Sequence, residues 1–232
     1  MQQKLILTED GSHSIEVPEL GVTYHSIHGA IQESKHVFIE AGLYAVTDLL
    51  LPVDPIRIFE VGFGTGLNAL LTIIQAEKLN RKIYYKAIEL FPLHLEEARS
   101  LNYCRILYRN DLQTSFEQLH ICDWETEITI TSQFHFEKTE TNLLNFRTSE
   151  TCLSGRQAFD LIYFDAFAPG AQPELWTEKI FEKMFSILQP GGVLVTYCSK
   201  GAVRRAMQSA GFTVQKIPGP PGKREIVRAI KI

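Results

Sequence analysis

No stretch of this sequence approaches the roughly 20 consecutive apolar residues that a membrane-spanning helix needs. The first ten residues, MQQKLILTED, also lack the apolar core of a secretory signal peptide. We find no internal repeat and no low-complexity segment. These absences argue against a membrane protein, a solenoid and an exported chain, and we expect a soluble, cytoplasmic protein.

Cysteine is scarce and scattered, with no Cys-x-x-Cys pair among Cys104, Cys122, Cys152 and Cys198. This pattern suggests neither a disulfide framework nor a zinc site, and we expect reduced, partly buried thiols. His25, His28 and His36 lie close together in the sequence but have no carboxylate or cysteine partner at a ligand-like spacing. We therefore predict no metal.

Acidic residues are nearly absent from the last part of the chain. Residues 199–232 contain eight lysines and arginines against the single Glu225, a local charge of +7 that leaves −11 for residues 1–198. Such a segment can attract phosphate, although it can equally be the solvated face of a helix and a hairpin. Lys200, Arg204 and Arg205 share one face of an expected helix and are our candidates for contacts with nucleic-acid phosphates.

The length of 232 residues with 45% hydrophobic residues allows one sizeable core, or one core with a small appendage. Residues 4–17 alternate around Glu9-Asp10-Gly11, which predicts a β-hairpin. Residues 24–50 have apolar residues near helical spacing and end at Pro52, so we expect a helical lid or collar. We divide the chain into this appendage, 1–52, and a main domain, 53–232.

The main domain opens with IRIFEVGFGTGLN, Ile56 to Asn68, which predicts a buried strand, a tight glycine turn and a helix start. Glycines at alternate positions allow sharp backbone angles and leave room for a nucleoside. A dinucleotide fingerprint would need its third glycine one residue later. Glu-x-Gly-x-Gly-x-Gly instead resembles the first motif of class I S-adenosylmethionine (SAM) methyltransferases, whose acidic residue, here Glu60, faces the methionine ammonium. A plain strand-to-helix turn is the alternative.

A second strand, residues 82–90, ends in Glu89, which lies 23 residues beyond Gly66. Nucleotide-binding α/β folds place an acidic residue at about this distance to accept hydrogen bonds from ribose hydroxyls. Glu89 could also simply cap the following helix, which we expect to start at Pro92. Further along, TEITITS and QFHFEK predict a hairpin or an edge strand, and Glu137 and Lys138 are the candidates to face an adenine.

The segment FDLIYFDAFAPGAQPELW, residues 159–176, predicts an apolar strand that delivers Asp165 to its carboxyl end, where open α/β sheets bind ligands. Amine methyltransferases often carry an Asp or Asn, a proline and an aromatic residue here. Asp165, Phe167 and Pro169 offer the same chemical groups in another order. A turn or a helix cap is the structural alternative for Asp165.

The remainder predicts an amphipathic helix, WTEKIFEKMFSIL, a turn at QPGGV (189–193), the strand VLVTYCS and a helix closed by Gly211. FTVQKI and REIVRAIKI then form two antiparallel strands. The expected fold is therefore α/β: a Rossmann-like class I methyltransferase with a doubly wound, mostly parallel sheet, an antiparallel C-terminal hairpin, and an N-terminal hairpin and helix.

Together GFGTGLN, AIELFP, DAFAPGAQPELW and AVRRAMQSAGFTVQKIPGPPGKRE resemble the motifs of the MnmC methyltransferase family. The resemblance implies a stand-alone enzyme that transfers methyl from SAM to 5-aminomethyl-(2-thio)uridine at the tRNA wobble position. It also implies tRNA as partner and a separate enzyme system that supplies the aminomethyl group. The implied cofactor contacts are Glu60, Gly62, Phe63, Gly64, Thr65, Gly66, Asn68, Glu89 and Lys138. Asp165 would be catalytic, and the implied substrate contacts are Glu33, Phe167, Pro169, Lys200, Arg204 and Arg205.

Two other functions remain open from the residues. The first is a related transferase, either a small-molecule amine methyltransferase or an aminopropyltransferase, although the latter usually has a Gly-Gly-Gly-Asp-Gly turn that GFGTG lacks. The second is a non-catalytic RNA-binding module with this fold. Loss of the glycines or of Asp165 would mark such a module, and all are present.

Overall fold

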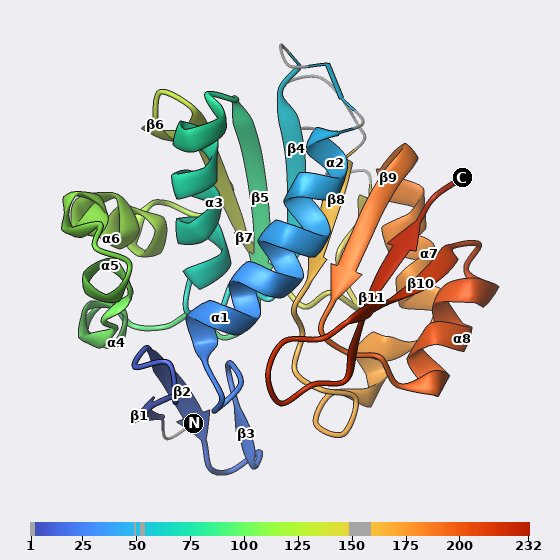
Figure 1. Cartoon of the computed structure of the whole chain (residues 1–232), viewed down its shortest axis with the longest axis horizontal. Coiled ribbons are helices and arrows are strands. Elements are labelled where there is room, and N and C mark those ends of the chain that lie inside the picture. Colours follow the sequence, from blue (N-terminus) through green and yellow to red (C-terminus); the bar gives the residue numbers. More distant parts are fainter. Residues whose placement is uncertain (1–2, 49, 52–53, 149–158) are drawn as a thin grey trace.

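The computed structural model describes residues 3–48, 50–51, 54–148 and 159–232. An eight-stranded sheet forms its centre, in the order β10-β11-β9-β8-β4-β5-β7-β6 (Figure 1). The parallel strands are β4 (Ile56–Val61), β5 (Ile83–Glu89), β7 (Phe134–Glu140), β8 (Phe159–Phe164) and β9 (Leu188–Thr196). The antiparallel strands are β6 (Ile128–Thr131), β10 (Thr213–Pro218) and β11 (Glu225–Ile230). The predicted doubly wound sheet is confirmed. Its antiparallel C-terminal hairpin, β10–β11, and the predicted hairpin β6–β7 are confirmed as well.

The two central strands, β4 and β8, are buried along their whole length. Their continuous apolar runs are typical of parallel strands that are covered on both faces. From β4 the chain continues outward to β5 and β7 on one side, and then returns to β8 and β9 on the other. The strand order therefore reverses between β4 and β8, where open α/β sheets bind their ligands.

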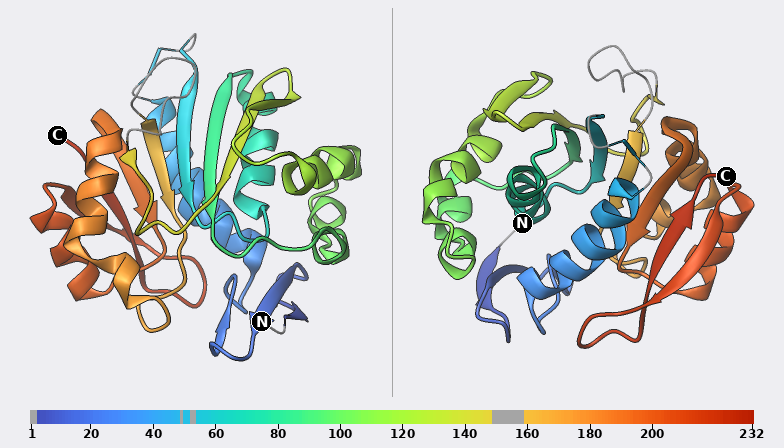
Figure 2. Two further views of the ribbon diagram at one scale, coloured as in Figure 1. Left: turned by 180° about the vertical axis from the view of Figure 1, so that it is seen from behind. Right: turned by 45° about the horizontal axis from the view of Figure 1, so that its top comes forward.

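Helices cover both faces of the sheet (Figures 1 and 2). One face carries α3 (Leu67–Leu79) and an N-terminal rod of α1 (Ala30–Ser34), the π-helix η1 (Lys35–Leu43) and α2 (Tyr44–Thr47). The other face carries α7 (Glu178–Ile187) and α8 (Gly201–Ser209). The remaining helices are α4 (Leu95–Ser100), α5 (Tyr103–Ile106), η2 (Asn110–Leu112), α6 (Gln113–Ile121) and η4 (Pro173–Trp176).

The rod is the helical segment predicted before the first core strand, but it packs flat on the sheet rather than forming a lid. Val37, Phe38 and Leu43 are fully buried in the core. Gly42 allows the close approach, because a Cβ there would come within 2.9 Å of Val195. Pro52 and the predicted domain boundary after it lie outside the described residues.

The predicted N-terminal hairpin is confirmed as β1 (Lys4–Leu7) and β2 (His13–Val17), and β3 (Val22–Thr23) extends it to three strands. This small sheet is tied to the main domain through Asn102. The Asn102 side chain accepts a hydrogen bond from His13 N at 2.8 Å and donates one to Gly11 O at 2.9 Å. No helix among the described residues has the length and the apolar run that a membrane crossing requires.

Two local predictions were wrong. The helix expected at Pro92 begins at Leu95. The Glu89 carboxylate holds Leu90 N and Phe91 N in a turn, and Glu97 then caps His94 N, so the helix can start only after His94.

The predicted turn at 189–193 is instead part of β9, which bulges there. Gly191 has a φ of +80°, and a Cβ on Gly192 would come within 2.8 Å of Gln189 O. These glycines therefore let the strand bulge without ending it.

Candidate cofactor and acceptor site

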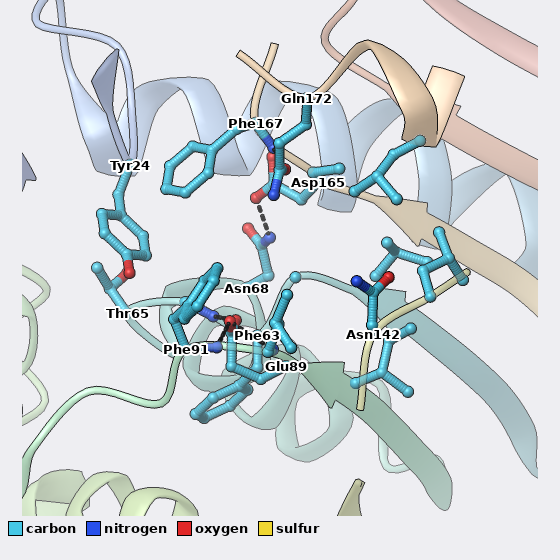
Figure 3. A pocket seen from close by; sticks show the side chains of 18 of the residues that line it. Tyr24, Phe63, Thr65, Asn68, Glu89, Phe91, Asn142, Asp165, Phe167 and Gln172 are labelled. Atoms are coloured by element: carbon cyan, nitrogen blue, oxygen red, sulfur yellow. Dashed lines mark hydrogen bonds between the residues drawn. The ribbon is translucent and has the colours of Figure 1, made fainter. Parts of the chain in front are cut away.

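A pocket opens at the carboxyl ends of β4, β5, β7 and β8 (Figure 3). This is the place where the strand order reverses. The lining combines the glycine turn, the ends of three further strands and the N-terminal segment. Its side chains and backbone come from Tyr24, His25, Val61–Thr65, Leu67, Asn68, Ile88–Phe91, Thr141–Leu143, Asp165–Phe167, Gln172, Glu174 and Leu175.

The glycine turn has left-handed backbone angles at three positions, with φ of +86° at Gly62, +51° at Gly64 and +73° at Gly66. L-residues rarely adopt such angles. Two of these glycines also face close neighbours: a Cβ on Gly62 would lie 2.7 Å from Asp165 O, and one on Gly64 would lie 2.9 Å from the Tyr24 ring. The glycines are thus required by the protein's own packing, in addition to any room they leave for a ligand.

Glu89 lies at the end of β5 and faces the pocket. Its Oε2 accepts a hydrogen bond from Gly64 N, and its Oε1 accepts bonds from Leu90 N and Phe91 N, all at 2.8 Å. These bonds fix the carboxylate against the glycine turn. Oε2 keeps a second lone pair, so Glu89 can still accept a hydrogen bond from a ribose hydroxyl.

Asn68 connects two carboxylates at the floor of the pocket. Its Nδ2 donates to Asp165 Oδ2 at 2.9 Å and to Glu60 Oε1 at 3.0 Å. Glu60 is fully buried and does not line the pocket, so it reaches a ligand only through Asn68. Burial raises the pKa of Glu60 well above its usual range, and the nearby charge of Asp165 adds to this effect.

Asp165 follows β8 and lies beside the turn, as its N–H donates to Val61 O at 2.9 Å. Burial raises the pKa of its carboxyl group to about 7. The negative charge of Glu33 adds to this shift, whereas the hydrogen bond from Asn68 and the charge of Lys223 oppose it. The pocket therefore holds a carboxyl group that can exchange a proton near neutral pH.

Two aromatic rings, Tyr24 and Phe167, face each other at the rim, edge to face with centroids 5.1 Å apart (Figure 3). The Phe167 backbone is anchored on both sides. Its N–H donates to Gln172 Oε1 at 3.1 Å, and its carbonyl accepts a hydrogen bond from Trp176 Nε1 at 2.8 Å. Between these rings and Asp165, a flat ring with an amine substituent could stack and present its nitrogen to the carboxylate.

Several residues proposed from the sequence lie outside the pocket. Gly66 begins α3 behind the turn, and Pro169 is half-buried beyond Phe167. Glu33 is buried nearby and pairs with Lys223. The basic candidates Lys200, Arg204 and Arg205 lie on or next to α8; Lys200 and Arg205 are exposed, and Arg204 is half-buried with its Nε donating to Ser199 O.

The adenine-facing candidates from the sequence do not reach the pocket either. The Lys138 Nζ donates to Leu119 O and His120 O and lies 4.4 Å from the centre of the Trp124 ring. Glu137 pairs with Lys86 at 2.6 Å. Strand β7 continues to Glu140, so both residues lie within the strand rather than at its end, and we remove Lys138 from the proposed cofactor contacts.

Asn142 takes the place that those candidates were meant to fill. It follows β7 and lines the pocket on the same side as Glu89 (Figure 3). The pairing of Glu89 with Glu140 puts the ends of β5 and β7 level. Following the alternation QFHFEK for a few more residues could have located this strand end. Phe91 and Gln172 lie within the quoted motifs AIELFP and DAFAPGAQPELW but, like Tyr24, were given no role from the sequence.

His25 is buried beneath the pocket, where its Nε2 lies 2.7 Å from Thr65 Oγ1. Burial lowers its pKa to about 4, so the ring is neutral at physiological pH. No group of three His, Cys, Asp or Glu side chains suited to a metal occurs in the part of the chain that the structure describes. Cys104 and Cys198 are buried free thiols and Cys122 is partly buried, while Cys152 lies outside the described residues.

The pocket residues fit SAM. The glycine turn brings bare backbone to the pocket, and Glu89 Oε2 lines it with a free lone pair for a ribose hydroxyl. Asn68 Oδ1 is buried without a hydrogen-bond partner among the described residues, so it can accept a bond from a methionine ammonium. Glu89 and the ionised form of Asp165 also bring carboxylates to the pocket, which suits a sulfonium. A parallel sheet with this turn and this acidic site defines the class I SAM-dependent methyltransferases.

The comparison with known families agrees with this class. Residues 111–232, just over half of the chain, match the family described as S-adenosyl-L-methionine-dependent methyltransferase. The chain belongs to this family, and SAM is the cofactor of the family. The recognition made from the sequence motifs is thereby confirmed.

The chain is also similar to solved structures, and the match to the first of the two shows the same fold. The chain superposes on MnmC2 from Aquifex aeolicus with a TM-score of 0.78 and 24% identity, over 98% of this chain and 69% of that one. DesVI from Streptomyces venezuelae matches with a TM-score of 0.48 and 11% identity, over 87% of this chain and 92% of that one.

Proposed function

We propose that this protein methylates the amine of 5-aminomethyl-(2-thio)uridine at the wobble position of tRNA, using SAM and giving the 5-methylaminomethyl product. The observation that carries the proposal is the position of Asp165. Its carboxylate lies beside the glycine turn that would hold SAM and below the Tyr24–Phe167 pair that could hold a base. The tRNA substrate and the separate enzyme system that makes the aminomethyl group are part of the proposal because the sequence motifs resemble those of the MnmC family, and the shared fold with MnmC2 supports this.

SAM would supply the methyl group: the new N–C bond forms as the C–S bond breaks, and sulfur keeps the electron pair. The protein's task is to orient the amine in line with that bond and to keep its nitrogen unprotonated. An alkylammonium has a pKa near 10 in water, so the amine must lose a proton. In the proposal, Asp165 orients the amine and receives this proton, which it passes to water. A pKa of about 7 suits Asp165 to that step far better than an ordinary aspartate.

We assign the cofactor to Glu89, Asn68, Asn142 and the backbone of residues 62–65. Glu89 would bind the ribose, Asn68 the methionine ammonium and Asn142 the adenine edge, with Leu90, Phe91 and Leu143 around the ring. Phe167 and Tyr24 would stack against the uracil once it leaves the anticodon stack. Lys200, Arg204 and Arg205 would bind phosphates of the anticodon stem.

Nucleoside mass spectrometry tests the proposal directly. Bulk tRNA from cells that make the aminomethyl group but cannot methylate it is incubated with the protein and SAM. We expect the mass of the wobble nucleoside to rise by one methyl group. Asp165→Ala should lose turnover by about a hundredfold or more, as expected for a positioned acid–base group, while SAM affinity measured by calorimetry changes little.

A small-molecule amine acceptor is the competing function, because the pocket alone would accept any flat aminomethyl compound. Free 5-aminomethyluridine and simple polyamines should be poor acceptors if the RNA surface contributes to binding. Efficient methylation of these compounds, together with no methylation of the tRNA, would replace the tRNA proposal with that alternative.

A further inference from the structure

The loop between β10 and β11 closes onto the N-terminal segment on the inner side of the pocket. Gly222 packs against the His28 ring, and Pro218 O lies 2.8 Å from His36 Nε2. From this loop Lys223 reaches Glu33 on α1 and forms an ion pair with its Oε1. Residues 190 positions apart in the sequence thus meet beside the pocket.

Both members of this ion pair are held in place. The Glu33 side chain is only 8% exposed, and its Oε2 accepts a hydrogen bond from Ser26 N at 2.8 Å. The Lys223 Nζ lies 4.0 Å from the centre of the Tyr197 ring, within cation–π distance. Tyr197 in turn donates to Ala166 O at 2.8 Å, the residue next to Asp165. The ion pair is therefore linked to the backbone next to Asp165 through Tyr197, and its two charges also act on the Asp165 carboxyl group.

Asp165 responds to both partners, and in opposite directions. The charge of Glu33 favours its protonated form, and the charge of Lys223 favours its ionised form. The hydrogen bond from the Asn68 amide lowers the pKa of Asp165, and the charge of Asp165 in turn raises the pKa of Glu60, Tyr85 and Tyr197. His25, near Glu33 and Lys223, is neutral at physiological pH because its pKa is about 4.

We propose that Glu33 and Lys223 are a pair of positioning residues that act on the reaction through Asp165: Glu33 favours proton uptake by Asp165, and Lys223 holds Glu33 and limits that effect. Neither residue lines the pocket, so neither needs to touch the acceptor. The inference rests on the proposed function only in assigning the acceptor amine to Asp165. It adds a role for Lys223, which the sequence motifs did not single out.

The test is a direct titration of Asp165, read from the side-chain carboxyl signal in NMR of protein labelled with 13C-aspartate and assigned with Asp165→Asn. We compare wild type, Glu33→Gln and Lys223→Met. The midpoint should fall in Glu33→Gln and rise in Lys223→Met, each by about 0.5–1 pH unit, as expected for a neighbouring charge that is partly screened. Lys223→Arg, which keeps the charge, is the matched control and should titrate as wild type does.

The pH dependence of single-turnover methyl transfer to tRNA, at saturating SAM, gives the second readout. The acidic limb should move with the NMR midpoints, in opposite directions for the two variants. A purely structural ion pair would instead lower the rate of both variants equally and leave both midpoints unchanged, which would overturn the inference.

If Lys223→Met does not fold, the double variant Glu33→Gln with Lys223→Met removes both charges and should titrate close to wild type. A midpoint in the double variant that equals that of Glu33→Gln would also overturn the role of Lys223.

The two readouts separate this inference from the proposed function. Opposite NMR shifts without any methylation of tRNA would support the pair and refute the tRNA substrate. Methylated tRNA with unshifted midpoints would support the substrate and refute the pair.

Discussion

The Nδ2 atom of Asn68 lies 2.9 Å from Oδ2 of Asp165, and the same atom also donates to the buried Glu60. One amide therefore holds two carboxyl groups of raised pKa at the floor of the pocket. Asn68 lies on the helix that follows the glycine turn, and Asp165 follows the neighbouring strand β8. The side of the site assigned to the cofactor and the side assigned to the acceptor are thus connected by a single side chain.

Asp165→Asn should stabilise the protein at neutral pH. The unfolded chain releases the Asp165 proton near pH 3.8 and the folded chain near pH 7, so wild type loses stability as the pH rises through this window. The variant lacks this loss. We expect a gain of about 1–2 kcal/mol in the free energy of unfolding at pH 8, a reduced value because the side chain is partly solvated. Below a pH of about 4 we expect no gain, because Asp165 is then protonated in both the folded and the unfolded chain.

Urea denaturation at pH 4 and pH 8 measures this difference. The exposed Asp48→Asn is the control and should behave as wild type does at both pH values. Equal stability of Asp165→Asn and wild type at pH 8 would mean that Asp165 is already well solvated in the folded protein.

Gly64→Val should weaken SAM binding by about a hundredfold while the far-UV circular dichroism spectrum stays that of the fold. The φ of +51° is unfavourable for valine, and the added side chain would push on Tyr24. Each effect costs on the order of 1–3 kcal/mol. Gly170→Ala is the matched control, because a Cβ at that position meets nothing within 4 Å. Calorimetry with unchanged affinity in Gly64→Val would place the nucleoside elsewhere.

Asn142→Leu should weaken SAM binding about tenfold, the loss of one hydrogen bond to the adenine. Lys138 lies within β7, the strand that Asn142 follows, and Lys138→Met should leave the SAM affinity of the folded protein unchanged. It should instead lower the free energy of unfolding by about 1–3 kcal/mol, because Leu119 O and His120 O lose their donor. The reverse pattern, with Lys138→Met losing affinity and Asn142→Leu keeping it, would restore Lys138 as the adenine contact.

The double variant Arg204→Ala with Arg205→Ala should raise the KM for tRNA and leave SAM affinity unchanged. Each phosphate contact releases counterions, so losing one should flatten the slope of log affinity against log salt by roughly 0.7–0.9. The control is Lys78→Ala with Lys82→Ala, which removes the same charge from exposed positions at the opposite end of the sheet. If both pairs of substitutions change the slope equally, the arginines act only through net charge.

Much of this fold could be predicted because the decisive signals are local. The run before Glu60 is apolar except for Arg57, and the glycines after it leave a strand-to-helix turn as the simplest solution. The same holds for Asp165 after its own apolar strand. What the sequence could not reveal depends on contacts across the chain. The true start of α4 is decided by how Glu89 binds the backbone, and the role of Asn142 is decided by where β7 ends against β5.

The interpretation of charged residues was the least reliable step. Lys138 and Glu137 have the expected polarity near the expected strand end, yet one binds helix carbonyls and the other a buried lysine. Glu33 is in the right neighbourhood, but its partner, Lys223, is 190 positions away. A charged residue that is buried requires a partner, but the sequence does not show which residue that partner is, because this depends on the fold.

The meeting of Lys223 with Glu33 also bears on how the protein matures during synthesis. Every residue that lines the pocket has been translated once the ribosome reaches Leu175. Strands β9 and β11, which flank β8 on that side, and the loop that carries Lys223 are made later. A nascent chain would therefore leave the far edge of β9 and Glu33 without these partners until the final hairpin emerges. If the pair acts on Asp165 as proposed, the contact that completes the fold is also the one that adjusts proton uptake at the site, so a shortened chain should transfer methyl poorly.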